Sequence, residues 1–173
     1  MTHHLSIDLP PTRWMRPVRT KWGTFNPHQK KLDFIKALLK KMWKREPLNG
    51  SLFVKMVFVM PIALSLTPKK RSALVNQYHC KDPDIDNLQK FYLDVMSGIV
   101  CLDDCQFSHV EALKVYGERP RVDIMLSKLD AKVVAQEYLE NMMLFDQSQR
   151  VETGARAAFS SDLIVNSDQS GGM

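Results

Sequence analysis

The chain has 173 residues and a mass of 19.9 kDa, which is enough for one domain and leaves no room for a second full domain. Hydrophobic residues make up 45% and charged residues 25% of the sequence, as is ordinary for a globular protein. We expect no membrane association, because no apolar run reaches the roughly 18 residues of a transmembrane helix. Asp8 and Pro10 also stand where a signal peptide would have its apolar stretch.

The net charge of +5 is unevenly distributed along the chain. Residues 1–80 contain 15 Lys and Arg against 3 Asp and Glu, residues 81–106 contain 2 against 6, and residues 107–173 contain 7 against 10. A basic surface attracts polyanions such as nucleic acid. Clustered carboxylates repel polyanions unless a cation lies between them. This combination within one small domain is the main indication of function.

The first part of the chain is predicted to contain a strand, a basic loop and a helix. Leu5–Leu9 alternates apolar and polar side chains, as a strand does, and residues 10–26 are a loop rich in Arg, Trp, Pro and Thr. Asn26 and Pro27 are typical of a helix start, and apolar residues then recur at helical spacing up to Trp43. The other face of this helix is either a solvated face or a surface for phosphates, and its lysines are Lys30, Lys31, Lys40, Lys41 and Lys44.

The middle of the chain is predicted to contain a central strand, a mobile loop and a second helix. The β-rich run Ser51–Met60 follows a turn at Asn49 and Gly50. Residues 61–80 lack periodicity and form the loop, whose basic triplet Lys69-Lys70-Arg71 is either solvated or in contact with nucleic acid. Residues 86–98 form the helix, with Asp86 as its cap and Gly98 at its end.

The last part of the chain is predicted to contain a β-hairpin, a helix and a tail. Gln106–Tyr116 and Arg121–Leu126 are its strands, joined by the turn 117–120. Residues 131–144 form a C-terminal helix, and residues 145–173 form a polar, disordered tail. The predicted fold over residues 1–130 is therefore a single α+β domain, with a small mixed sheet of about four strands packed against two to three helices.

Carboxylates gather in two short segments of the acidic part. Asp84 and Asp86 point to the same side if the backbone between them is extended, about 6–7 Å apart along the chain. Asp103 and Asp104 directly precede a predicted strand. Several neighbouring carboxylates cannot all stay ionised without help, and hard oxygen ligands suit Mg²⁺ or Mn²⁺. The alternative is that these aspartates are helix caps and surface charges in a basic DNA-binding protein that has no catalytic activity.

Three cysteines cannot all pair with one another, which suits a reducing compartment. Cys101 and Cys105, with His79-Cys80 and His109, leave open a zinc site. Structural zinc usually needs two closely spaced ligand pairs, so ordinary buried thiols are the alternative.

Two blocks of sequence resemble the signature of RusA-type Holliday junction endonucleases. The first runs Pro83-Asp84-Ile85-Asp86-Asn87-Leu88-Gln89-Lys90, followed by Leu93-Asp94, Gly98 and Asp103-Asp104-Cys105-Gln106. The second, Lys114-Val115-Tyr116-Gly117-Glu118-Arg119-Pro120, resembles the strand and turn that follow in that family. The resemblance is dense over residues 81–128 and looser over residues 1–80.

The resemblance implies a Mg²⁺-dependent, homodimeric nuclease that resolves four-way DNA junctions by paired nicks in recombination and repair. By motif position, Asp84, Asp86 and Asp104 are then the metal-binding carboxylates, and Asp103 assists them. Lys90 is the active-site lysine, with a helix salt bridge to Asp86 or Asp94 as its alternative role. Such a protein would be cytoplasmic, bacterial or phage-type, associated with the nucleoid, and would need no small-molecule cofactor. The basic residues expected to contact DNA are Arg13, Arg16, Arg19, Lys69, Lys70, Arg71, Lys81 and Lys114.

Overall fold

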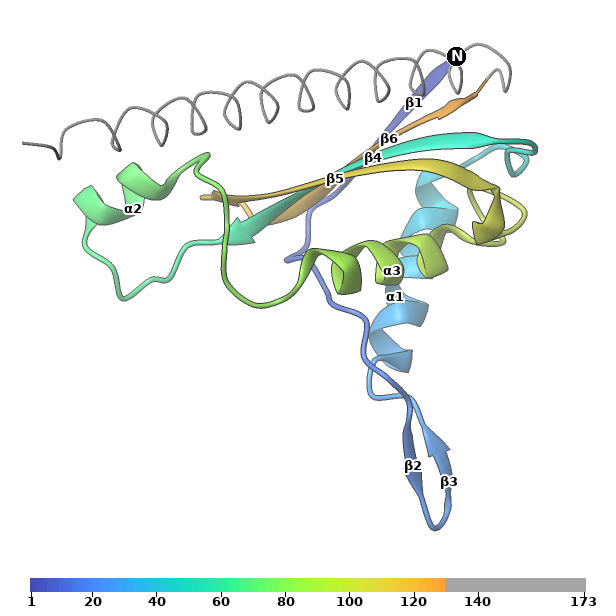
Figure 1. The fold of residues 1–173 in the computed structure, drawn as a ribbon, viewed down its shortest axis with the longest axis horizontal. Helices are drawn as coiled ribbons and strands as arrows, with labels where there is room; N and C mark the ends of the chain where they lie inside the picture. The colour runs from blue at the N-terminus through green and yellow to red at the C-terminus, as the bar shows by residue number, and fades with distance from the viewer. Residues whose placement is uncertain (130–173) are drawn as a thin grey trace, which may run out of the picture. The chain divides into compact units, whose positions relative to one another are not determined.

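A four-stranded mixed sheet forms the centre of the fold in this computed structural model, which describes residues 1–129 (Figure 1). The order of the strands across the sheet is β1 (Thr2–Ile7), β6 (Arg121–Lys128), β4 (Leu52–Pro61) and β5 (Phe107–Gly117). The predicted α+β class with a small mixed sheet is confirmed. The predicted helix 131–144 and tail 145–173 lie outside the described residues.

Strands β5 and β6 do not pair with each other, so the prediction of a hairpin at residues 117–120 is wrong. Strand β4 lies between them, parallel to β5 and antiparallel to β6. One face of β4 is fully buried through Val54, Met56 and Phe58, whereas the other face ranges from Val59, only 5% exposed, to the exposed Lys55. A strand with so much buried apolar surface is most stable at the centre of a sheet, and this preference outweighs direct pairing of sequence neighbours.

Two helices cover one face of this sheet (Figure 1). Helix α1 (Gln29–Met42) buries Ile35 and Leu39, and helix α3 (Ile85–Met96) buries Phe91 and Val95. These side chains belong to one hydrophobic cluster with the inner residues of the strands. For α1, the apolar residues at helical spacing include the buried Ile35 and Leu39, whereas Phe34 is 60% exposed.

Both helices begin at residues other than those predicted. Helix α1 is capped by His28, two residues after the predicted cap, and the Asn26 side chain accepts a hydrogen bond from the His28 N–H at 3.0 Å. Helix α3 is capped by Asp84, with an extended backbone (φ −64°, ψ 147°), and Asp86 lies in the first turn. The Asp84 carbonyl already accepts from the Leu88 N–H at 3.2 Å, so the helical hydrogen bonds start two residues before the predicted cap.

Two further elements lie where the sequence predicted loops. Residues 10–26 contain a separate hairpin of β2 (Val18–Thr20) and β3 (Gly23–Phe25). Residues 61–80 contain helix α2 (Pro68–Leu74), which carries the basic triplet. Neither element has a buried residue. Their sequences therefore lack the regular spacing of apolar residues from which the other helices and strands were predicted. Within residues 1–129, no helix is both long and apolar enough to span a bilayer.

Tyr92 ties the basic segment before the hairpin to the core. Its side chain is fully buried, and its hydroxyl accepts a hydrogen bond from the Thr12 N–H at 3.3 Å. Burial raises the pKa of Tyr92 to about 12. Since Thr12 is only 3% exposed, its N–H has little access to water as an alternative partner.

We expect Tyr92→Phe to lower the free energy of unfolding by about 1–3 kcal/mol, because the substitution leaves a buried donor without an acceptor. Urea denaturation of the wild type and the variant would measure this difference. A change of only a few tenths of a kcal/mol would show that this hydrogen bond does not anchor the segment.

Candidate active site

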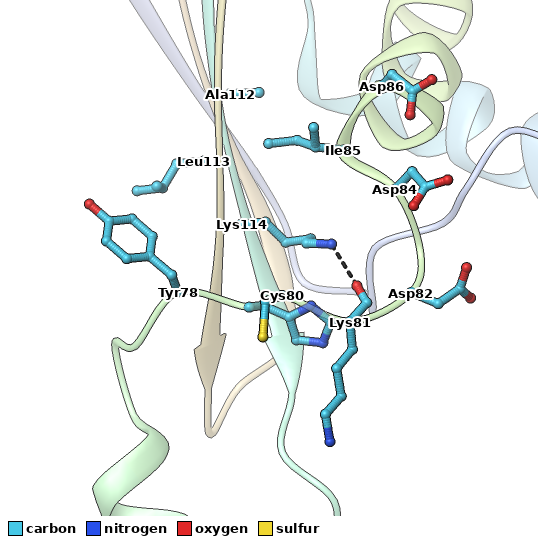
Figure 2. A pocket seen from close by; sticks show the side chains of 11 residues that line it. Tyr78, Cys80, Lys81, Asp82, Asp84, Ile85, Asp86, Ala112, Leu113 and Lys114 are labelled. Atoms are coloured by element: carbon cyan, nitrogen blue, oxygen red, sulfur yellow. Dashed lines mark hydrogen bonds between the residues drawn. The ribbon is translucent and has the colours of Figure 1, made fainter.

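The segment before helix α3 lies beside strand β5, and an open, shallow hollow of about 600 Å³ lies between them (Figure 2). Backbone hydrogen bonds fasten the segment to the strand: the His79 N–H donates to the Lys114 carbonyl, and the Tyr116 N–H donates to the Gln77 carbonyl, both at 2.9 Å. The segment then turns away through the cis peptide bond between Asp82 and Pro83 and enters the helix.

Three carboxylates of this segment, those of Asp82, Asp84 and Asp86, point to the same side of the chain, away from β5 (Figure 2). Arg13 forms an ion pair with Asp82 at 2.9 Å, and both side chains are largely exposed. Asp84 and Asp86 are exposed, and no ion pair or hydrogen bond engages either carboxylate among residues 1–129. Both carboxylates are therefore accessible, although the extended backbone assumed between them is absent, because Ile85 and Asp86 already belong to α3.

Lys114 holds the segment by its backbone. Its ammonium group donates to the carbonyl oxygens of Lys81 and Pro83, both at 2.6 Å, and Figure 2 shows the first of these bonds. Two charge-assisted hydrogen bonds from one lysine fix the course of the chain immediately before Asp84. The sequence placed Lys114 on the DNA surface, whereas the structure directs its charge to the loop that carries the acidic pair.

Asp103 stabilises the turn that presents Asp104. The carboxylate of Asp103 accepts from the Cys105 N–H at 2.9 Å, at the start of the short 3₁₀ helix Asp104–Gln106. Hydrogen bonds from the Cys105 thiol and backbone lower the pKa of Asp103. The Gln106 side chain completes a capping box by accepting from the Asp103 N–H at 3.2 Å.

Asp104 lies beside the second half of helix α3. Burial raises the pKa of Asp94, and the negative charge of Asp104 raises it further, whereas Lys90 and Lys36 lower it. Asp94 follows Asp86 by eight residues, or about 12 Å along the helix axis. Asp104 is therefore a neighbour of Asp94 in the described structure.

The structure does not bring three of the four predicted aspartates together into one cluster. Among residues 1–129, no three His, Cys, Asp or Glu side chains lie close enough together to hold a metal ion. Asp84 and Asp86 supply a pair of hard oxygen donors of the kind that Mg²⁺ prefers, so this pair fits the ion by its chemistry. A third carboxylate would have to approach the pair.

Lys90 packs against a tryptophan that the sequence analysis did not single out. Its ammonium group lies 4.0 Å from the centre of the Trp14 ring, a cation–π contact. The backbone N–H of Trp14 donates to the Asn87 carbonyl at 2.8 Å, which fixes the backbone of Trp14 beside the first turn of α3. A sequence pattern could not reveal this contact, because Trp14 and Lys90 come from distant segments.

The cysteines are placed in a way that does not favour zinc. Cys101 is buried, and burial together with the nearby charge of Asp104 raises its pKa to about 11. Cys80 and Cys105 are exposed. Among residues 1–129 no three His, Cys, Asp or Glu side chains gather as a zinc site requires, so the buried Cys101 is an ordinary core thiol.

The remaining basic residues predicted to contact DNA lie on exposed segments. Arg16 and Lys81 are exposed in loops, and Arg19 is exposed on β2. Lys69 and Lys70 are exposed on α2, and Arg71 is half-buried at its last turn. The role of these residues in binding DNA stays a prediction.

Asp94 gives the stability of the fold a defined pH dependence. Its pKa is raised above the ordinary value of 3.8, so folding favours its protonated form, and the fold loses stability as pH rises from that value through the folded pKa. We expect Asp94→Asn to raise the melting temperature at pH 7 and to change it little where the wild-type carboxyl is already protonated. Thermal melts of both proteins at the two pH values, with EDTA present, would test this. A lower melting temperature of the variant at pH 7 would contradict it.

Comparison with known proteins gives a family match and one partial relative. The family model described as endodeoxyribonuclease RusA matches residues 8–127. The protein named "Uncharacterized protein YqaN", from Bacillus subtilis (strain 168), is 30% identical over 83 residues, which are 47% of this chain and 58% of that protein. The chain thus spans less than two thirds of the length of this relative.

Proposed function

We propose that this chain, which belongs to the RusA endodeoxyribonuclease family, resolves four-way (Holliday) DNA junctions by paired symmetric nicks. The observation that carries the proposal is the exposed pair Asp84 and Asp86 at the start of α3, whose carboxylates point to one side (Figure 2). We further propose Mg²⁺ as the cofactor, with Mn²⁺ as a substitute. The cellular role would be DNA recombination and repair, close to the nucleoid.

Each residue of the site has a distinct task in this proposal. Asp84 and Asp86 would hold the ion, and Asp104 would have to approach them to serve as a third ligand, while Asp103 keeps the turn of Asp104 in place. The bound ion would supply Lewis acidity at the phosphate and a more acidic water molecule. Lys90 stabilises the negative charge that develops on the phosphate, and the Trp14 ring positions its ammonium group.

The DNA arms would be held by phosphate contacts from exposed cations on several elements. Such contacts fix position without reading sequence, so binding should weaken steeply as the salt concentration rises. Two symmetric cuts also require two equivalent sites at a fixed separation. A homodimer with a two-fold axis provides them, and we therefore propose a homodimer.

The test is cleavage of an immobile four-way junction by the full chain with Mg²⁺, with each strand labelled in turn. We expect one nick in each of two opposing strands at symmetric positions, and no nick in linear duplexes of the same sequence. Addition of EDTA should stop the reaction. Absence of cleavage with both Mg²⁺ and Mn²⁺ would refute the proposal.

A second candidate is a DNA-binding protein without catalytic activity. It is favoured by one observation, that residues 1–129 do not bring three metal-binding side chains together. A wild-type chain that binds the junction tightly and never cuts it would support this candidate.

A further inference from the structure

The β2–β3 hairpin extends away from the main sheet, beyond the end of α1 (Figure 1). It forms a two-stranded sheet of its own, in which Arg19 pairs with Thr24. Residues 9–32 contain no Asp or Glu, so this projecting arm carries only positive charge. Such an arm is suited to contact with a polyanion.

The turn of the hairpin has a built structure. The Thr20 hydroxyl donates to the Gly23 carbonyl at 2.9 Å and accepts from the Trp22 N–H at 3.2 Å. Gly23 has a φ of +133°, a backbone conformation that other residues rarely adopt. These features hold Trp22 at the tip.

The hairpin exposes apolar side chains that serve no core. Trp22 is 87% exposed, and Phe25 is 61% exposed on the adjoining strand. Tryptophan is on average highly buried in folded proteins, and residues 1–129 provide no packing role for this ring. The Lys21 ammonium group lies 4.9 Å from the centre of the Trp22 ring, so a cation accompanies the aromatic face.

We propose that Trp22 stacks on a nucleobase exposed at the branch point of the DNA junction, while Lys21 and Arg19 contact the flanking phosphates. This inference rests on the proposed function. An aromatic ring beside cations on a projecting arm is the combination that binds single-stranded nucleic acid, by stacking on bases and by attracting the backbone. Bases inside a duplex have both faces covered by their neighbours, whereas opening a branch point uncovers base faces. The contact would thus favour junctions over linear DNA.

The experiment compares Trp22→Ala, Trp22→Phe and the wild type in binding to an immobile junction and to a linear duplex of the same sequence, with EDTA present to prevent cleavage. Trp22→Ala should weaken junction binding about tenfold or more, the loss of one stacked base, and should change duplex binding less than about twofold. Trp22→Phe, which keeps a stacking ring, should retain most of the affinity. Phe34→Ala is the matched control, because it truncates an aromatic ring that is 60% exposed on α1, and it should bind as the wild type does.

A second readout locates the contact. A junction with 5-iodouracil at the branch point, irradiated in complex with the wild type, should form a crosslink that mass spectrometry assigns to Trp22. Equal losses on junction and duplex, or no loss on either, would overturn the inference. So would a change in oligomeric state of Trp22→Ala in sedimentation, because the ring would then belong to a contact between copies of the chain.

The two proposals fail in different ways. If the wild type cuts junctions and Trp22→Ala binds them equally well, the branch-point contact is refuted and the nuclease stands. If the wild type neither binds nor cuts junctions, both are refuted. If Trp22→Ala loses junction binding selectively and the wild type never cuts, the contact stands and the catalytic proposal falls.

Discussion

Asp84→Asn is expected to reduce junction cleavage at least about a hundredfold, the scale of losing a main electrostatic group of an active site, while junction binding is retained. The substitution keeps the size of the side chain and removes its charge. Asp84 caps α3 without a side-chain hydrogen bond to the helix, so the fold does not depend on its carboxylate. Cleavage rates at saturating protein, together with binding measured in EDTA, would separate the two effects.

Asp82→Asn is the matched control for this prediction. Asp82 lies two residues away on the same exposed segment, and its carboxylate is paired with Arg13. An exposed ion pair contributes little to stability, so we expect this variant to cut at nearly the wild-type rate. Equal losses in the two variants would mean that general acidity of the segment matters and that Asp84 has no special role.

Lys114→Met is expected to reduce the cleavage rate at saturating junction by about ten- to a hundredfold, because small displacements of reacting groups have effects of this size. The ammonium group holds the carbonyls of Lys81 and Pro83, and its loss frees the segment that positions Asp84. Since the charge is used within the protein, the affinity for the junction should change little.

If Lys114 instead contacts a phosphate directly, its loss should lower the affinity for the junction and leave the rate at saturation unchanged. The salt dependence of the affinity would also decrease. Lys114→Arg, which keeps the charge and the donors, should restore part of the rate. Lys55→Met is the control, because Lys55 lies on the neighbouring strand β4 and pairs with Glu111 at 3.0 Å.

The sequence predicted those parts of the fold that depend on local patterns. The buried faces of α1 and α3 follow from apolar spacing, and the central strand from a continuous β-rich run. The position of β4 between β5 and β6 depends on which strand is most stable at the centre of the sheet. The turn residues 117–120 carry no information about this preference. The start of helix α2 at Thr67-Pro68 could have been predicted locally. The helix was missed because it has no buried face and so no apolar spacing.

In the candidate site, too, contacts between segments distant in sequence could not be predicted. Asp84 and Asp86 lie on one side of the chain (Figure 2), but not for the reason given by their spacing, because Ile85 and Asp86 already belong to α3 and the backbone between the two aspartates is not an extended strand. The use of Lys114 to hold backbone carbonyls, and the approach of Asp104 to Asp94, arise between segments that are distant in sequence. Trp22 lies in a basic loop whose sequence shows no regular pattern. Only the structure shows that it lies at the exposed tip of a hairpin.

In the proposed mechanism, Asp84 and Asp86 together hold a divalent cation. Titration of the full chain with Mn²⁺, followed by electron paramagnetic resonance of the free ion, tests this claim without any dependence on cleavage. We predict a bound ion in the wild type and in Asp82→Asn, and an affinity at least about tenfold weaker in Asp84→Asn and Asp86→Asn, the order of effect seen even for outer groups of metal sites. A weaker affinity in Asp104→Asn would identify the third ligand. Equal Mn²⁺ binding by the wild type, Asp84→Asn and Asp86→Asn would contradict the account.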